Sequence, residues 1–179
     1  MTRSPVAAQR SALFTTDHLL CRRWIATDVE PLFEVYSDAD AMQWVGDGKP
    51  ITRAQCQEWL EVTEANYIQR GYGMFTLELR ETGEVVGFAG LVHPDRQSEA
   101  EIKYALSRKH WGRGLASELI PSLLRYGAEV HGLHRILATV ARGNSISRHV
   151  LQKSGLQWIA VRHEADGSLT DVLAWLSAG

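Results

Sequence analysis

The segment 111–116 has the residue types of an anion-binding turn. Gly112 and Gly114 flank Arg113, between a stretch rich in β-formers and a stretch with helical periodicity. Glycine lacks a Cβ, so the backbone can come close to a ligand at both positions. A helix that begins directly after such a turn has main-chain N–H groups without intrahelical partners, and its dipole favours negative charge. The turn is therefore predicted to bind a phosphate or diphosphate, with Arg113 adding positive charge at the rim.

Two common nucleotide-binding motifs do not fit this turn. Its glycine spacing is too short for the dinucleotide pattern G-x-G-x-x-G, and no Lys followed by Ser or Thr completes a P-loop. Two glycines alone are a weak signal of binding. The interpretation therefore depends on the elements that position the turn.

The predicted elements follow a mixed α/β order. Runs of β-formers predict seven strands, at 18–24, 74–80, 85–93, 99–106, 135–140, 156–162 and 169–176. Helices are predicted from Thr27 through 36, over 39–45, from Thr52 onward, after Gly114, and over 144–153. The strand at 99–106 leads into the glycine turn, and a helix with Leu115, Leu119 and Leu123 on one face follows it.

Local signals suggest where two of the helices begin and what they bury. Thr27 and Glu30 have the spacing of a capping box at the first helix. The helix that Thr52 opens has four apolar side chains that could face the core, namely Trp59, Leu60, Val62 and Ile68. Three further tryptophans, Trp44, Trp158 and Trp175, are also expected in the core by default.

Composition indicates one ordinary globular domain. The chain has 179 residues, of which 45% are hydrophobic and 22% charged, and its formal net charge is −2. This balance gives no general attraction to nucleic acid or to anionic lipid. Residues 1–16 are interpreted as a flexible N-terminal arm and residues 17–179 as a single domain.

The cysteines and the hydropathy pattern bear on the location of the protein. Cys21 and Cys56 have no metal-like or redox-like spacing and are expected to be buried, reduced thiols. No apolar run of about 18 residues could span a bilayer, and the first residues lack the apolar core of a signal peptide. A cytoplasmic protein without a membrane or nucleic-acid partner is the expectation.

The chain resembles the GNAT superfamily of N-acetyltransferases over about residues 17–161. It is most similar to the branch that includes ribosomal-protein N-terminal acetyltransferases. The stretches that carry the resemblance are 83–91, 101–106, 111–118, 144–147 and 153–156. The resemblance implies an α/β (α+β) fold with a mixed, mostly antiparallel sheet of about seven strands, flanking helices and a central V-shaped splay that takes acetyl-CoA.

The resemblance also assigns residues to acetyl-CoA. In the superfamily the turn has the motif Gln/Arg-x-x-Gly-x-Gly/Ala, and Trp111 departs from its first position. The strand that ends at Leu106 would pair with the pantetheine arm, and the N–H of Leu106 would stabilise the thioester oxyanion. The implied acetyl-CoA contacts are Leu106, Ser107, Arg108, Trp111, Gly112, Arg113, Gly114, Leu115, Ala116, Ser117, Asn144 and Ser147.

Acetyl transfer to an amine needs the neutral amine, so a base helps at neutral pH. Glu101 is the first candidate for that base, because it resembles the family's usual base position; its alternatives are a solvated strand residue or a salt bridge with Lys103. Glu99 and His93 are weaker candidates. Ser147 matches a serine that this branch places near the sulfur, where it would protonate the leaving thiolate. Asn144 matches an asparagine that holds pantetheine, although capping of the helix would also explain it.

The resulting prediction is an acetyl-CoA-dependent N-acetyltransferase that acts by direct attack of a primary amine. The acceptor could be a protein N-terminus, a polyamine, an amino acid or an aminoglycoside-like amine. One alternative is a catalytically inactive CoA-binding regulatory or sensor module. Another is a self-assembling subunit that uses the last hairpin as an interface, since a homodimer is possible. No metal is expected, because His131 and His134 lack further ligands.

Overall fold

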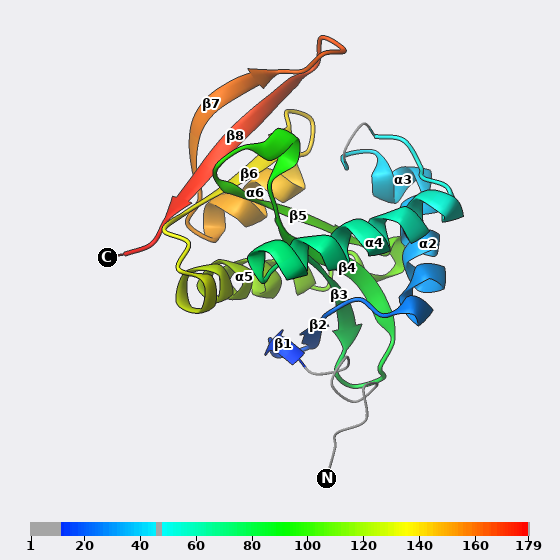
Figure 1. The fold of residues 1–179 in the computed structure, drawn as a ribbon. Coiled ribbons are helices and arrows are strands. Elements are labelled where there is room, and N and C mark those ends of the chain that lie inside the picture. The colour runs from blue at the N-terminus through cyan, green and yellow to red at the C-terminus, as the bar shows by residue number, and fades with distance from the viewer. Residues whose placement is uncertain (1–11, 46–47, 179) are drawn as a thin grey trace. The chain divides into compact units, whose positions relative to one another are not determined.

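The computed structural model describes residues 12–45 and 48–178 (Figure 1). Its strands form one mixed sheet in the order β1-β2-β3-β4-β5-β6-β8-β7. The strands are β1 Ala12–Thr15, β2 Leu19–Arg22, β3 Met74–Leu79, β4 Val85–Val92, β5 Ala100–Leu106, β6 Arg135–Ala141, β7 Gln157–His163 and β8 Leu169–Leu176. The helices are η1 Ala26–Asp28, α2 Val29–Ser37, α3 Ala39–Met42, α4 Arg53–Arg70, η2 Pro94–Arg96, η3 Arg108–His110, α5 Leu115–His131 and α6 Ser145–Lys153.

The chain divides into two compact units. One comprises the residues through Gly90 together with Tyr104–Leu115, and the other comprises Leu91–Lys103 and the residues from Ala116 onward. Strands β1 to β4 of the first unit pair antiparallel in succession. In the second unit the first residues of β5 pair parallel with β6, and β8 pairs antiparallel with both β6 and β7. The assignment of 17–179 to a single domain stays a prediction.

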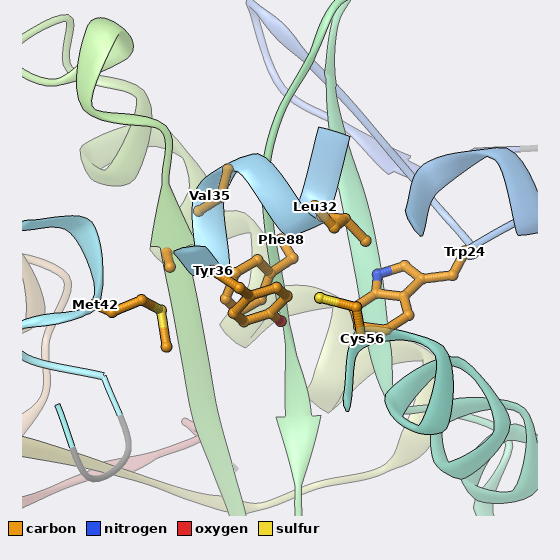
Figure 2. Close-up of a cluster of buried hydrophobic side chains, with 8 residues drawn as sticks. Trp24, Leu32, Val35, Tyr36, Met42, Cys56 and Phe88 are labelled. Carbon is orange, nitrogen blue, oxygen red and sulfur yellow. The ribbon is translucent and has the colours of Figure 1, made fainter. Parts of the chain in front are cut away.

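The core of the first unit forms where α2 and α4 pack on β4 (Figure 2). The ring of Tyr36 stacks on Phe88 with 4.0 Å between centroids. Cys56 lies in the same cluster, and burial raises the pKa of its thiol. Both cysteines are buried and free, as predicted. A buried thiol with a raised pKa is a weak nucleophile, so its role here is packing.

The second unit is built around α5. Its predicted apolar face is confirmed, since Leu119 and Leu123 have no exposed surface and Leu115 is 3% exposed. A Cβ at Gly127 would come within 2.9 Å of the Ile136 side chain, so the missing side chain lets α5 pack closely on β6. Figure 1 shows β7 and β8 as a long hairpin at the end of this sheet.

The element order is confirmed, but the sheet has eight strands in the described residues, where about seven were expected. The additional strand is β1, so the prediction of a flexible N-terminal arm is wrong for residues 12–15. Positions 1–11 lie outside the described residues. The capping box of Thr27 and Glu30 is also wrong. Thr27 lies inside η1, and Asp28 occupies the N-cap of α2.

The predicted apolar face of α4 is mostly wrong. Trp59, Val62 and Ile68 are 37%, 58% and 80% exposed, and the buried residues of this helix include Thr63 and Tyr67. Trp44 and Trp158 are exposed as well, against the default expectation for tryptophan. The face of α4 that is buried carries hydroxyl groups and a thiol, and hydrophobicity alone does not identify such a face. Thr52 does cap α4, through a capping box with Gln55.

Candidate functional site

The predicted anion-binding turn has the backbone geometry that such a site requires. Gly112 and Gly114 have φ angles of +71° and +76°, a region that glycine adopts readily and that residues with a Cβ rarely adopt. No atom of the described residues outside the immediate chain neighbours lies within 4 Å of a Cβ built at either position. Helix α5 begins at Leu115, directly after the turn. A diphosphate therefore has room to approach the first N–H groups of α5, where the helix dipole favours it.

The end of β5, just before this turn, is held by several contacts. The Ser107 N–H donates to the Val86 carbonyl at 2.7 Å. The indole N–H of Trp111 donates to the Leu106 carbonyl at 2.9 Å. A Cβ at Gly87 would lie 2.2 Å from the Ala105 carbonyl oxygen, so only glycine allows β4 to come this close to β5. The peptide units around Leu106 are thus fixed in direction.

The basic residues between β5 and the turn form ion pairs within the first unit. Arg108 contacts the carboxylates of Asp38, at 3.3 Å, and Asp40. Lys109 binds Glu84 at 2.5 Å, and this hydrogen bond lowers the pKa of Glu84. Arg108 was predicted to contact acetyl-CoA, and in the structure its partners are these two carboxylates. Arg113 is exposed at the rim of the turn.

The candidate base Glu101 lies in the second unit at the centre of a polar network. Its side chain has no exposed surface. Its Oε1 atom accepts from Lys103 Nζ and from Thr139 Oγ1, each at 2.5 Å. Its Oε2 atom accepts from Gln97 Nε2 at 3.1 Å and lies 4.0 Å from Arg162 Nη1. The salt bridge with Lys103, one alternative interpretation of this glutamate, is therefore present. The other alternative, a solvated strand residue, is wrong because the side chain is buried.

This network keeps Glu101 ionised. Burial alone would raise the pKa of Glu101, but Lys103, Thr139 and Arg162 together lower the pKa below the ordinary glutamate value. Lys103 and Arg162 are 34% and 38% exposed, so the network reaches solvent through its cations. The carboxylate can hold these cations in place, and its own atoms are covered.

The network depends on strand pairing that the sequence pattern does not reveal. Glu101 pairs with Leu137 in the parallel ladder between β5 and β6, and Thr139 follows two residues later on the same face of β6. Arg162 pairs with Thr170 in the hairpin of β7 and β8. Alternation along β6 could have pointed to Thr139 once its partner strand was known. Thr139 and Arg162 were missed because their strands are distant from Glu101 in sequence. Gln97 lies only four residues before Glu101, in a loop where no periodic pattern indicates the direction of a side chain.

The ladder between β5 and β6 is short. Its register runs from Ala100 opposite Ile136 to Ile102 opposite Ala138. β6 continues as a strand to Ala141 and pairs along its length with β8. The parallel pairing of β5 with β6 thus involves only the first residues of β5.

Asn144 and Ser147 lie at the start of α6. The Asn144 side chain accepts from the Ser147 N–H at 3.1 Å and so caps the helix. The capping interpretation of Asn144 is confirmed, and contact with a cosubstrate stays a prediction for both residues. Of the weaker candidates for the base, His93 contacts the Gln97 carbonyl at 3.0 Å, and Glu99 accepts from the Ser98 hydroxyl at 2.7 Å.

The His131 and His134 pair has aromatic and hydroxyl neighbours. The His131 ring meets Tyr126 edge to face, and His134 lies 3.2 Å from the Ser177 hydroxyl. Within residues 12–45 and 48–178, no group of three or more His, Cys, Asp and Glu side chains could hold a metal ion. The same part of the chain contains no helix with the length and apolarity needed to cross a lipid bilayer.

Comparison with known proteins defines the class as acetyltransferase. Residues 18–157 match the model of the acetyltransferase (GNAT) domain. The chain is 30% identical over 163 residues to a Bacillus licheniformis protein named uncharacterized N-acetyltransferase p20, an alignment that covers 88% of this chain and 90% of the relative. The chain therefore belongs to the GNAT acetyltransferase family, and it is an N-acetyltransferase that uses acetyl-CoA as its cosubstrate.

Solved structures agree with this fold. A GNAT-family acetyltransferase from Bacillus anthracis aligns with a TM-score of 0.77 at 24% identity, over 90% of this chain and 96% of that one. The coenzyme A complex of RimL, the ribosomal L7/L12 α-N-protein acetyltransferase, aligns with a TM-score of 0.77 at 16% identity, over 93% and 98% of the two chains. These likenesses confirm the α/β GNAT fold with its mostly antiparallel sheet.

Proposed function

We propose that this chain transfers the acetyl group of acetyl-CoA to a primary amine while the main-chain N–H groups of residues 112–117 hold the diphosphate of the cosubstrate. The observation that carries the proposal is the turn itself. Gly112 and Gly114 both have left-handed backbone conformations, both have open space where a Cβ would stand, and α5 begins directly after them. These features together favour a bound anion.

The N–H of Leu106 is our candidate for stabilising the oxyanion that forms when the amine attacks the thioester carbonyl. Such a donor is effective when its direction is fixed before the reaction. The contacts of Ser107, Trp111 and Gly87 around the end of β5 support this assignment, because they leave the neighbouring peptides little freedom. The Ser147 hydroxyl, near the start of α6, is the candidate donor to the departing thiolate.

For Glu101 we propose an indirect role. The side chain is covered, and its lowered pKa makes it a weak but fully ionised base at neutral pH. Its partly exposed partners Lys103 and Arg162 would meet a bridging water or the acceptor, and Glu101 would hold these two cations in place. Direct abstraction of a proton by Glu101 fits the geometry less well.

Two matched glycine substitutions test the diphosphate turn. Gly114→Val places a β-branched residue at φ +76° and fills the space beside the first turn of α5. Gly167→Val places the same residue at φ +84° in the hairpin turn between β7 and β8, where a Cβ also meets open space. Backbone strain is therefore similar in the two variants. We expect Gly114→Val to weaken acetyl-CoA binding at least ten-fold in calorimetric titration and Gly167→Val to leave it unchanged.

Turnover completes this test. Release of the CoA thiol should be followed over a panel of N-terminal peptides, polyamines, amino acids and aminoglycosides, since the acceptor could come from any of these classes. Equal acetyl-CoA affinity in the two glycine variants would overturn the diphosphate assignment. Binding of acetyl-CoA by the wild type without turnover on any amine would point instead to a regulatory or sensor module.

Assembly and location complete the proposal. We expect a cytoplasmic protein, which cell fractionation tests.

Trp158 and Ile159 of β7 are 54% and 42% exposed, and a homodimer through the last hairpin would cover them. Size-exclusion chromatography with light scattering measures the oligomeric state directly.

A further inference from the structure

Trp111 makes a contact that its place in the glycine turn does not require. Its indole Nε1 donates to the Leu106 carbonyl at 2.9 Å, although the residue is 48% exposed. An exposed ring contributes little to the core, so the fixed part of this side chain is its N–H group. The hydrogen bond joins the start of the turn to the end of β5.

The peptide that receives this hydrogen bond is restrained at both ends. Its carbonyl, on Leu106, accepts from Trp111, and its N–H, on Ser107, donates to the Val86 carbonyl at 2.7 Å. The preceding peptide, which carries the N–H of Leu106, lies against Gly87, where a Cβ would come within 2.2 Å of the Ala105 oxygen. Loss of the Trp111 hydrogen bond would leave the first of these peptides held at one end only.

The chemistry of the position explains the residue type. In Gln and Arg, which the family motif has at this position, an N–H group stands the same number of bonds from Cα as Nε1 does in tryptophan. All three side chains can therefore present a donor to the same strand-end carbonyl. The departure at Trp111 replaces the bulk of the side chain and keeps the donor.

We propose that Trp111 is a positioning residue: its indole N–H fixes the last peptide of β5 and so keeps the Leu106 N–H aimed at the thioester carbonyl. This inference rests on the proposed function, because it takes Leu106 as the oxyanion donor. A donor that is free to turn stabilises the oxyanion less, while the diphosphate turn is unaffected. The effect therefore falls on kcat and leaves the affinity for acetyl-CoA in place.

Two substitutions separate the N–H group from the ring. Trp111→Phe keeps an aromatic ring and removes the donor, whereas Trp111→Gln removes the ring and keeps a donor at the same reach. We expect Trp111→Phe to lower kcat about ten-fold, with the dissociation constant of acetyl-CoA within about two-fold of wild type. Trp111→Gln should stay within about three-fold of wild type in both. Amide hydrogen exchange should be faster at residues 105–107 in Trp111→Phe than in Trp111→Gln.

Each other result overturns the inference. If Trp111→Phe matches the wild type and Trp111→Gln is impaired, the ring acts by packing. If both variants weaken acetyl-CoA binding at unchanged kcat, Trp111 is a surface for the cosubstrate. If the two variants have equal kcat and equal exchange, the hydrogen bond has no positioning effect. Failure of the proposed function is a separate result, because the wild type itself would then show no turnover while the exchange comparison still reports on the hydrogen bond.

Discussion

Asp28 in the first unit and Glu101 in the second are both buried carboxylates that accept several hydrogen bonds, yet their surroundings differ. Asp28 binds the guanidinium of Arg22 through two hydrogen bonds of 2.8 and 2.9 Å, and it also accepts from the Ile25 N–H and the Thr76 hydroxyl. Arg22 is itself only 3% exposed. The cations around Glu101, Lys103 and Arg162, are instead more than one third exposed.

This difference separates a structural network from a candidate functional one. A charge pair that is buried at both ends cannot exchange partners with water or substrate, so the Asp28 network serves the fold. A buried carboxylate with exposed cations can hold those cations for a ligand. The exposure of the partners, more than the burial of the carboxylate, therefore points to function.

The largest expected effect is on stability in the Asp28 network. Asp28→Ala leaves the guanidinium of Arg22 buried without this partner, which should lower the free energy of unfolding by about 3–5 kcal/mol. Urea denaturation measures this change in the free energy of unfolding. The control is Glu64→Ala, which removes the exposed partner of Arg23 and should cost less than about 1 kcal/mol. Similar losses in the two variants would contradict the structural assignment of Asp28.

Glu101→Gln should have a smaller effect on stability than Asp28→Ala and a larger effect on turnover. Lys103 and Arg162 can be hydrated when the negative charge is removed, so the loss of stability should stay below about 2 kcal/mol. We expect kcat to fall at least about ten-fold with acetyl-CoA binding retained. Glu99→Gln, one residue before the same strand at an exposed carboxylate, is the control and should leave kcat unchanged. An unaltered kcat in Glu101→Gln would remove Glu101 from the mechanism.

The pH dependence should follow from the lowered pKa of Glu101. A carboxylate whose pKa is lower in the folded state than in the unfolded state stabilises the fold above its unfolded pKa of about 4.3. That stability is lost as the pH falls through the lowered value. Lys103→Met removes a cation that lowers the pKa of Glu101, so the acid loss of stability should move to higher pH. Thermal unfolding between about pH 3 and 6 tests this, with Lys153→Met as the control that should leave the profile unchanged.

The smallest expected effects come from two threonines that donate to the two carboxylates. Thr139→Val removes the hydroxyl that donates to Glu101, and Thr76→Val removes the one that donates to Asp28. Each should cost about 1 kcal/mol of stability. Only Thr139→Val should also lower kcat, by about three-fold. Equal kcat in both variants would mean that the Glu101 network does not contribute to turnover.

Several features of this protein were set by the sequence alone. The order of elements, the turn at Gly112 and Gly114, and the cap at Asn144 are confirmed, because they depend on local signals such as hydrophobic period, glycine and side-chain capping. The family follows from the same local stretches, taken in order. Local rules failed where a competing local partner existed, as at Thr27, where Asp28 occupies the N-cap of α2.

Tertiary structure decided which side chains meet. Glu101, Thr139 and Arg162 come together only through the order β5-β6-β8-β7, in which strands distant along the chain become neighbours. Long-range packing likewise decided which face of α4 is exposed, and it brought Arg22 and Asp28 together as a buried pair. Periodicity reports which face of an element is apolar, whereas the partner of a polar group depends on long-range packing, which no local pattern encodes.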